Sequence, residues 1–354
     1  MEVFIRNIGN ISPQHTTDPV KFLDTIAEYE SVSMNCIEPD YKEYLNPVNA
    51  RRMGRIIKMG VAAAKICLKG TDIDVPDAII TGTGLGCIED TEKFLIAILE
   101  NDERLLPPTS FIQSTHNTVS AQIALDLKCH NYNYTYVHKA LSFESALLDA
   151  LMMISEKEAK NILLGSADEI TPNSIAIFSR LGMLKRKPIK NTGLYNSMSK
   201  GSIAGEGAAF FLLADEYQKG DLAKVKAVSS LFNTDGSLLI NSEIVEFLAD
   251  NDLAKNDIDL VIYGYNGDSE FDFVYDNVRK SIMKGIPAVR YKHLCGEYFT
   301  SSSFALWLAA KTISTQLIPE TVRIDIEQPK NIKNILIYNQ YRNTNHSLIL
   351  VSKC

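Results

Sequence analysis

The strongest constraint on the fold lies between residues 131 and 169, where three successive patterns predict one compact unit. Residues 131–137 (NYNYTYV) alternate aromatic or β-branched residues with smaller polar ones, which is typical of a strand with one buried face. Residues 142–160 carry apolar side chains around most of a helical circumference, so we expect a buried helix there. Residues 161–166 (NILLGS) indicate a short apolar strand. The order predicts a β-α-β unit.

The start of this helix is expected to point from the core at residues 138–141, which read His-Lys-Ala-Leu. A helix N-terminus offers free N–H groups and a positive partial charge, so it can house a nucleophilic thiolate or an oxyanion. No thiol is present in this turn, and the position therefore lacks the most obvious nucleophile.

The composition is that of a globular protein and argues against several classes of partner. The 354 residues are 45% hydrophobic and 22% charged, which leaves room for two structural halves around a large core. The net charge of −7 disfavours nucleic acid or an anionic membrane as the main partner. Residues 185–190 hold a short basic cluster, which we expect to be a solvated loop. Because residues 1–10 lack a basic leader and no apolar run reaches about 18 residues, we predict a cytoplasmic protein without a membrane span.

The cysteines show neither a metal-binding nor a disulfide pattern. None of the six belongs to a CxxC pair, and their spacing does not suit a metal, so we expect free thiols in a reducing compartment. No metal and no cofactor are expected. The cysteines are Cys36, Cys67, Cys87, Cys129, Cys295 and Cys354.

Further patterns predict elements along the rest of the chain. Residues 50–67 indicate an amphipathic helix whose basic face either docks an acidic partner, such as an acyl carrier protein, or is simply solvated. Residues 76–86 indicate a buried strand running into glycines whose spacing fits neither a dinucleotide fingerprint nor a P-loop. Residues 18–28 fit a helix or a loop equally well. The remaining predicted strands are residues 3–11, 202–214, 225–230, 259–265, 334–338 and 347–351, and the remaining helices are residues 240–254 and 301–312.

Residues 109–169 resemble the β-ketoacyl synthases of the thiolase superfamily. Residues 108–125 are similar to the family's interface segment before the nucleophile strand, and residues 165–168 (GSAD) are similar to its Gly-Gly-x-Glu strand end. The resemblance covers the chain from about residue 76 to its last residue. It implies the α/β thiolase fold, in which duplicated β-α-β-α-β halves, here residues 1–218 and 219–354, stack in a five-layer α-β-α-β-α arrangement.

At the chemical positions of that family the sequence departs from the family pattern. Counting back from GSAD puts the family's catalytic cysteine at Ala140. The strand that ends in His-Gly-Thr in the family ends here at Tyr265 and Asn266, for which we favour a turn over a hydrogen-bond donor to a carbonyl. The second catalytic histidine is replaced by Glu297, which we expect to pair with Lys292 rather than to act as a buried acid.

Two nearby stretches extend the comparison. His293 lies four residues before Glu297 and is expected to be structural or exposed. Residues 339–346, expected to connect two closing strands, are similar to the family's glycine-rich acyl gate, with Tyr341 in place of its mobile phenylalanine. Polar side chains replace the gate glycines, which removes the backbone freedom that a swinging gate uses.

With these replacements, the resemblance implies a chain-length factor, the non-condensing partner of an active ketosynthase in fatty acid, type II polyketide, or aryl polyene or flexirubin-type biosynthesis. Loss of the nucleophile and both histidines is expected to abolish condensation. Such a subunit forms a heterodimer through the strand at residues 131–137, works with an acyl carrier protein and helps to wall the acyl tunnel. The side chains expected at the tunnel or interface are Phe111, His116, Asn117, Tyr134, Tyr136, Phe143 and Tyr341.

Two other functions stay open on the sequence. A divergent acyl-transfer or condensing enzyme would use Ser142 as its nucleophile, with His138 and Glu144 close in sequence. The simpler interpretation is that Ser142 and Ser145 satisfy free N–H groups at the helix start. The third possibility is a homodimer that binds an acyl or aryl ligand without turnover and is stable without a different partner.

Overall fold

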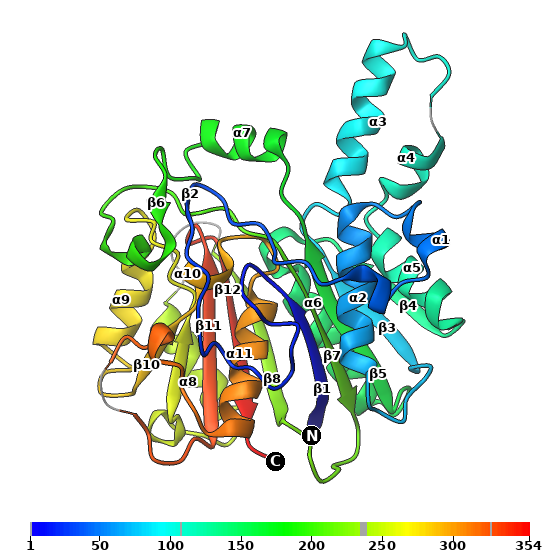
Figure 1. Cartoon of the computed structure of the whole chain (residues 1–354). Coiled ribbons are helices and arrows are strands. Elements are labelled where there is room, and N and C mark those ends of the chain that lie inside the picture. The colour runs from blue at the N-terminus through cyan, green and yellow to red at the C-terminus, as the bar shows by residue number, and fades with distance from the viewer. Residues whose placement is uncertain (1, 107, 234–238, 326–327) are drawn as a thin grey trace.

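The computed structural model describes residues 2–106, 108–233, 239–325 and 328–354, which form a mixed α/β structure (Figure 1). The strands are β1 (Val3–Ile11), β2 (Glu30–Ser31), β3 (Ala78–Gly82), β4 (Tyr132–Tyr136), β5 (Asn161–Asp168), β6 (Ile189–Lys190), β7 (Gly207–Ala214), β8 (Ala223–Phe232), β9 (Leu260–Tyr263), β10 (Ala288–Arg290), β11 (Asn334–Tyr341) and β12 (Asn345–Ser352).

The helices alternate with these strands. They are α1 (Pro47–Ala50), α2 (Arg55–Leu68), α3 (Ile88–Glu100), α4 (Pro108–Gln113), α5 (Thr118–Leu127), α6 (Ser142–Ser155), α7 (Pro172–Arg180), α8 (Ile240–Ala249), α9 (Phe273–Lys280), α10 (Lys292–Cys295) and α11 (Ser302–Thr315), with a 3-10 turn η2 (Lys139–Leu141) before α6. Among the residues that the structure describes, no helix is long and apolar enough to cross a membrane.

The large sheet contains an internal repeat. Its order is β10-β9-β11-β12-β8-β1-β7-β5-β3-β4, so each half, with the small β2-β6 sheet set aside, places its third, second, fourth, fifth and first strands side by side. In the first half β3 is parallel to β4 and β5, and β5 is antiparallel to β7. In the second half β9 is parallel to β10 and β11, and β11 is antiparallel to β12. The halves meet where β1 pairs antiparallel with β8.

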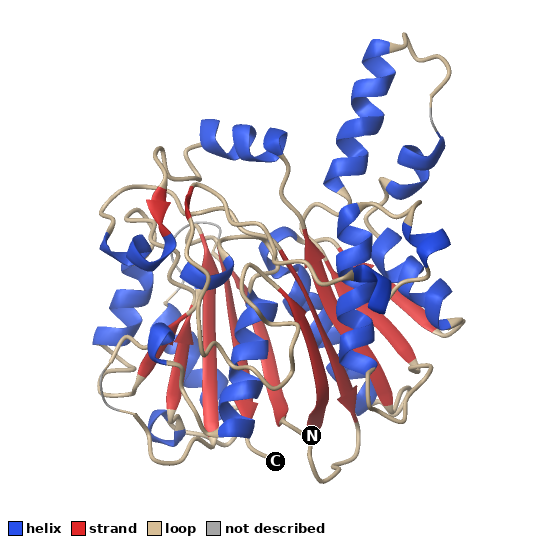
Figure 2. Ribbon diagram, in the orientation of Figure 1, coloured by secondary structure: helices blue, strands red, loops and turns tan. Residues whose placement is uncertain are grey.

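Three apolar clusters place the helices in layers around the two halves (Figure 2). On β5, Ile162 and Leu164 face the central cluster with α6 and α11, whereas Leu163 faces an outer cluster with α2 and α5. Residues of β9 alternate in the same way between the central cluster and an outer cluster with α8 and α9. The result is the five-layer α-β-α-β-α thiolase arrangement, as expected from the sequence, and the two sheet layers are continuous at β1 and β8. The division near residue 218 falls between β7 and β8 and stays a proposal.

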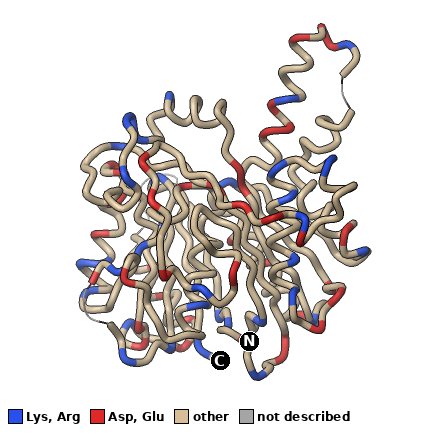
Figure 3. Tube along the Cα trace, viewed as in Figure 1, with Lys and Arg blue, Asp and Glu red and all other residues tan. Residues whose placement is uncertain are grey.

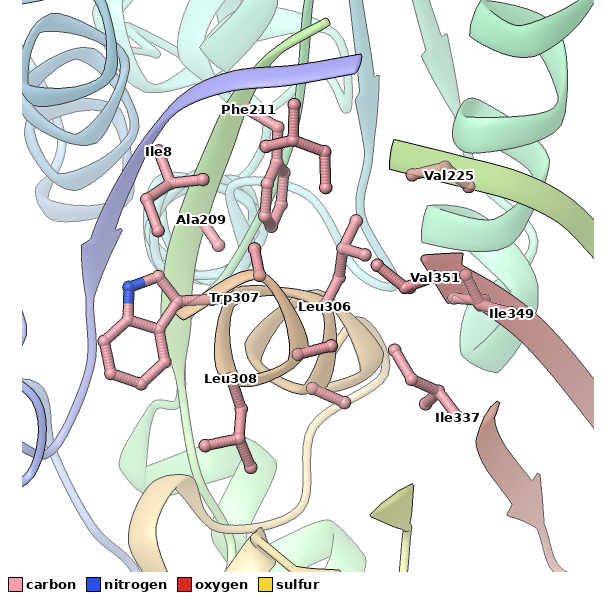
Figure 4. Close-up of a cluster of buried hydrophobic side chains, with 14 of the residues drawn as sticks. Ile8, Ala209, Phe211, Val225, Leu306, Trp307, Leu308, Ile337, Ile349 and Val351 are labelled. Atoms are coloured by element: carbon pink, nitrogen blue, oxygen red, sulfur yellow. The ribbon is translucent and has the colours of Figure 1, made fainter. Parts of the chain in front are cut away.

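The central helices are buried because they carry apolar or small side chains on nearly every side. In α11, Leu306, Trp307 and Leu308 are all buried. Figure 4 shows them among side chains of β1, β7, β8, β11 and β12, which belong to both halves. Each large side chain fully buried in this way contributes roughly 1.5–3 kcal/mol to folding. One helix layer therefore stabilises both halves at once.

Two predicted elements differ from the structure in an informative way. The helix expected from residue 50 begins at Arg55, because the preceding Gly54 has an extended ψ of 166° and acts as the N-cap. Strand β4 was expected to bury one face, but Tyr132, Asn133 and Tyr134 are exposed. The reason is topological: β4 is the outermost strand and pairs only with β3.

Helices α3 and α4 form an arm that rises from the body beside β4 (Figure 1). Along α3 the one buried side chain among the described residues is Asp90, at its base. Apolar side chains on the arm are exposed instead, namely Leu95, Ile96, Leu99, Phe111 and Ile112. The arm therefore carries an apolar surface that this chain leaves uncovered.

Candidate functional site

A pocket lies between the halves, where the carboxyl ends of β3, β5 and β9 approach the β11–β12 hairpin. Its volume is about 60 Å³, and α7 with the chain after it supplies one wall through Phe178, Met183 and Leu184. The carboxyl end of parallel strands is where open α/β sheets bind their ligands. The residues expected from the sequence are therefore located relative to this pocket.

The turn that begins α6 places Ala140 in the core. Ala140 is 4% exposed within η2, and the preceding Lys139 has a positive φ of 49°. A bulky residue in that conformation costs on the order of 1 kcal/mol or more, so the turn is held by its surroundings. The methyl group of Ala140 offers neither a nucleophile nor a proton, and Ala140 is not among the pocket-lining residues.

Ser142 lies at the start of α6, as predicted, but its hydroxyl makes its hydrogen bonds within the turn before the helix. Its hydroxyl accepts a hydrogen bond from the backbone N–H of His138 at 2.7 Å and donates to the carbonyl of Lys139 at 2.7 Å. The side chain is fully buried. The expectation that Ser142 and Ser145 cap free helix N–H groups is wrong, because Ser145 donates to the Leu141 carbonyl. These bonds fix the turn and leave the Ser142 hydroxyl without a base.

The two potential bases for Ser142 are engaged elsewhere. His138 meets Ser142 through its backbone, not through its imidazole. Glu144 is fully buried, and its Oε1 accepts a hydrogen bond from Ser347 Oγ at 2.8 Å. Burial raises the pKa of this carboxyl, which favours its uncharged form. The described contacts thus contain no Ser-base pair at the start of α6.

The residues after β9 form a turn, as the sequence predicts. The backbone N–H groups of Asn266 and Gly267 donate to the carboxylate of Asp272 at 3.1 and 2.8 Å, and Gly267 has a φ of 78°. The Tyr265 hydroxyl donates to Asp276 at 2.8 Å, away from the pocket. The Asn266 side chain instead reaches Glu297, and its Nδ2 donates to Oε2 at 2.7 Å.

Glu297 forms the predicted ion pair. Lys292 Nζ lies 2.9 Å from Oε1 and 2.7 Å from Oε2 of Glu297, and the Lys292 side chain is almost completely buried. Pairing supplies the partner that a buried ammonium group requires. Lys292 therefore donates to both oxygens of Glu297, Asn266 donates to Oε2 as well, and Glu297 faces the pocket as a neutralised group.

His293 is structural and buried rather than exposed. Nδ1 lies 3.2 Å from the Tyr195 hydroxyl and Nε2 lies 3.1 Å from the Thr321 hydroxyl. Burial and the charge of Arg290 lower the pKa of His293 to about 3, so the ring stays neutral at physiological pH. It does not replace the imidazole that is missing at Glu297.

The stretch expected to connect β11 and β12 belongs to the strands themselves. Asn339, Gln340 and Tyr341 pair with Ser347, His346 and Asn345 in the β11–β12 ladder. Only a tight turn remains, in which Arg342 and Asn343 have φ values of 51° and 52°, as in a type I′ hairpin.

The hairpin also determines where Tyr341 lies. Its ring centroid is 5.5 Å from that of Phe299, which lies against Gly84. Burial, with a smaller effect of the Glu297 charge, raises the pKa of Tyr341 to about 12. The structure thus brings together Asn266, Glu297 and Tyr341 and leaves Ala140 outside this pocket.

Asp168 joins the two halves through contacts that the sequence did not reveal. Its Oδ1 accepts hydrogen bonds from Thr83 Oγ1 and Gly84 N, and its Oδ2 accepts from the backbone and hydroxyl of Thr300. The distances are 2.8–3.0 Å. The GSAD motif indicated an acid at a strand end, but the Thr300 partner is 132 residues away in the chain.

The expected tunnel or interface residues divide into two groups. Phe111 is 57% exposed and Tyr134 is 50% exposed, His116 and Asn117 are also exposed, and Tyr136 is partly buried. Phe143 is fully buried, and its ring lies 5.9 Å from that of Phe211 in the central layer, so it is not on the surface of this chain. It sits on the inner side of α6, where the apolar face meets the sheet.

Two basic segments also differ from expectation. Arg55, expected on a docking or solvated face, forms ion pairs with Glu206 and Glu38. Lys185, expected in a solvated loop, is buried, and its Nζ donates to the carbonyl oxygens of Ser199 and Gly267 at 2.7 and 2.6 Å. Figure 3 shows basic and acidic residues interspersed along the trace.

Comparison with known proteins identifies the family of the chain. Residues 11–219 match the family described as Beta-ketoacyl synthase, N-terminal domain. A 3-oxoacyl-[acyl-carrier-protein] synthase 2 of Vibrio cholerae is 23% identical over 199 residues, or 53% of this chain. A synthase of the same description from Staphylococcus aureus is 21% identical over 181 residues. The matches span about half the length of these curated relatives, 48% and 44% respectively.

Solved structures resemble the whole chain. The structure described as the ishigamide ketosynthase/chain length factor has a TM-score of 0.78 at 17% identity, and the similarity covers 100% of this chain and 99% of that one. A β-ketoacyl synthase of Burkholderia phymatum has a TM-score of 0.81 at 14% identity with the same coverage. A ketosynthase in complex with its chain length factor from Xenorhabdus doucetiae has a TM-score of 0.76 at 13% identity, covering 100% and 98%. These similarities show the fold.

Proposed function

This chain belongs to the β-ketoacyl synthase family, and we propose that it acts as the chain-length factor of an active ketosynthase. In this role it forms a heterodimer, works with an acyl carrier protein in the cytoplasm and performs no condensation of its own. The biosynthetic system is a fatty acid, polyketide or aryl polyene-type pathway.

The observation that carries this proposal is the set of side chains at the family's chemical positions. A condensing enzyme needs a nucleophile that can be acylated and groups that polarise the thioester carbonyl. Here Ala140 supplies a methyl group, and Asn266 and Glu297 bond to each other at 2.7 Å. Lys292 holds Glu297 as a carboxylate, which accepts hydrogen bonds and cannot donate one. The arrangement supports a protein that keeps the fold of the family but does not catalyse condensation.

The β11–β12 hairpin supports the same role. Tyr341 ends a strand, and its neighbours Gln340 and Asn339 are buried within the ladder. The Gln340 backbone N–H donates to the Tyr275 hydroxyl at 2.8 Å. A segment paired on one side and bonded to α9 on the other is fixed in place. A fixed hairpin suits a wall of the acyl tunnel better than a gate that opens in each catalytic cycle.

The free edge of the sheet supports a partner. The described residues place no strand beside the outer edge of β4, so its N–H and C=O groups are available to a second chain. Tyr132, Tyr134 and Val137 expose aromatic and apolar surface along this edge. Exposed Leu125, Leu148 and Met152 on α5 and α6, with the α3–α4 arm, extend the surface. Exposed apolar side chains near an open strand edge support a protein interface at this edge.

The serine-enzyme alternative gains no support from the geometry. The Ser142 hydroxyl uses its donor and acceptor roles within the turn, and Glu144 is bonded to Ser347. A nucleophilic serine needs a base within hydrogen-bond reach. We therefore do not propose an acyl-transfer reaction at Ser142.

The proposal is tested by co-expression of the tagged chain with ketosynthases from its own genome. Size exclusion and an acyl-carrier condensation assay then follow on whatever co-elutes. The expected result is a one-to-one complex whose turnover requires the partner's cysteine and is unchanged by Ser142→Ala. Turnover by the chain alone that Ser142→Ala abolishes would refute the proposal. A stable homodimer that ignores every ketosynthase would also contradict it.

A further inference from the structure

Helix α7 forms a wall of the pocket, but the rest of the chain holds it loosely. No described helix or strand packs along α7, and Ser174 is its one buried residue. Figure 1 shows α7 at the top of the view, apart from the other helices. Toward the pocket it presents Phe178, whose ring lies 6.2 Å from that of Phe299. A segment with so little tertiary packing changes position at low cost.

Helix α7 is nevertheless well defined as a helix. Thr171 and Ser174 form a capping box at its start, and Pro172 occupies its first turn. Just past its end, Gly182 has a φ of 72°, which is the left-handed conformation that often terminates a helix. A helix that is capped at both ends and loosely packed moves as one body. A contact at its start therefore affects the position of its whole length.

The start of α7 is bonded to α3 through Glu92. Glu92 Oε1 accepts a hydrogen bond from Thr171 Oγ1 at 2.6 Å, and Oε2 accepts from Asn173 Nδ2 at 3.1 Å. A carboxylate is also favoured electrostatically at a helix N-terminus. One turn earlier in α3, the Glu89 N–H donates to Glu169 Oε1 at 3.1 Å. The first two turns of α3 therefore hold the segment that leads from β5 into α7.

The outer turns of α3 belong to the surface that the proposed partner would cover. Three apolar side chains beyond Glu92 are exposed, namely Leu95, Ile96 and Leu99. Because α3 is one continuous helix from Ile88 to Glu100, a partner that fixes its outer turns also fixes Glu92. The arm thus connects a surface outside the chain with the wall of the internal pocket.

We propose that α3 and α7 act as a lever, in which binding of the ketosynthase to the arm is transmitted through Glu92 and restrains the wall that carries Phe178. This inference rests on the proposed function, because the ketosynthase supplies the restraint. Transmission requires that the ketosynthase binds the arm best in the position in which Glu92 reaches α7. The pocket wall is then mobile in the free chain and fixed in the complex.

The test is hydrogen–deuterium exchange of the full chain, alone and with a saturating amount of the ketosynthase with which it co-elutes. Exchange is followed separately in α3 and in α7. In the parent chain the ketosynthase should slow exchange in both helices. The effect in α7 should be roughly five- to tenfold, because two hydrogen bonds to a carboxylate hold its start once the arm is fixed.

Variants of Glu92 separate transmission from binding. In Glu92→Ala the ketosynthase should still protect α3 but no longer α7, and α7 of the chain alone should exchange severalfold faster than in the parent. Glu92→Gln keeps one of the two acceptor oxygens, so its effect should be intermediate. Ser179→Ala, an exposed change on α7 that leaves the Glu92 bonds in place, is the matched control and should behave as the parent does.

The lever and the proposed function fail in different ways. If no ketosynthase protects α3, the proposed function is refuted, and the partner has no part in restraining α7. Protection of α3 without protection of α7 in the parent would overturn the lever and leave the proposed function intact, as would equal protection of α7 in the parent and in Glu92→Ala. An unchanged exchange rate of α7 in free Glu92→Ala would overturn the lever without any partner.

Discussion

Strands β4 and β10 occupy equivalent positions in the two halves, but the outer edge of β10 is covered by the chain and the outer edge of β4 is open. Each is the third strand of its half, and each ends the ten-stranded sheet. The edge of β10 is covered by its own chain: Val289 bridges to Arg323, the Ile324 N–H donates to the Ala288 carbonyl, and the Ala288 N–H donates to Asp325 Oδ2. The described residues place no such cover beside β4.

The side chains of the two edges differ in the same sense. β10 is three residues long and mostly buried, whereas β4 is five residues long and presents Tyr132 and Tyr134 to solvent. Proteins usually protect exposed edges because open ladders invite pairing. One duplicated topology thus carries a protected edge and an open one. In the proposed complex, the first half would therefore supply the edge that binds the partner.

The largest expected effect comes from a charge placed on the open edge. Tyr134→Asp should weaken the complex with a partner ketosynthase by roughly 100-fold, because it removes an aromatic contact and buries a charge. Size exclusion of the co-expressed pair measures this. Lys284 is exposed and lies shortly before β10 in the chain, so Lys284→Asp is the matched control and should leave the complex intact. Co-elution of Tyr134→Asp with its partner would show that β4 is not the interface.

The next effect concerns the cover of the other edge. Asp325 accepts from the Ala288 N–H and forms an ion pair with Arg279. Asp325→Ala should reduce the free energy of unfolding by about 1–2 kcal/mol, a fall of a few degrees in Tm. Light scattering should also detect more self-association, since the β10 edge loses a bond that covers it. An unchanged Tm would mean that the covering segment does not depend on Asp325.

A smaller effect distinguishes the halves by pH. Burial raises the pKa of Glu169 in the first half to about 8 and that of Asp272 in the second half to about 7. The native state therefore binds protons that the unfolded chain has released, so stability is highest in acid and falls as pH rises through these values. Glu169→Gln should remove the part of that fall that is due to Glu169, which extends from the ordinary carboxyl value of 4.5 to about 8.

Thermal melts across this pH range make the comparison. The fall that remains in Glu169→Gln should include the contribution of Asp272, whose raised pKa is about 7. Glu158→Gln should reproduce the parent curve. Identical curves for the parent and Glu169→Gln would mean that this carboxyl is charged in the native protein at neutral pH.

The smallest effect lies at the rim of the open edge. Met152 on α6 is 50% exposed and lines a hollow with Val225 and Lys226 of β8, away from the centre of the β4 edge. Met152→Ser should weaken the complex only two- to threefold, because rim contacts contribute little. Titration of the labelled ketosynthase with the variant measures this. A loss as large as that of Tyr134→Asp would move the centre of the interface from β4 to α6.

The sequence predicted the central β-α-β unit well because the burial of α6 is encoded locally. Apolar residues round most of a helix favour burial, and α6 is found in the middle layer, although Leu148 and Met152 on its other side are exposed. The Lys292–Glu297 ion pair was also predictable, since the two residues are five apart and opposite in charge. The Asn266–Gly267 turn followed from the conformational preferences of these residue types.

The other features depend on partners far away in the chain. Gln340 and His346 looked like loop residues, but both are buried. The Gln340 N–H donates to the hydroxyl of Tyr275 on α9, and the hydroxyl of Tyr338 on β11 lies 2.9 Å from His346 Nδ1. The turn between them uses positive φ at Arg342 and Asn343 without any glycine, so no residue type marked it. Likewise, only the fold brings Thr300 to Asp168 and leaves Glu169 with a free oxygen.

The single open edge also determines how many neighbouring chains can pair with the large sheet. A chain with two open edges would add neighbours at both ends and grow into a filament. A chain that has one end covered can accept one neighbour, and if that neighbour has the same topology, its own covered end stops further growth. In the proposed complex, the contact between Ala288 and residues 324–325 on the far side of the sheet would therefore limit the assembly to two subunits, although it lies outside the pocket and the proposed interface.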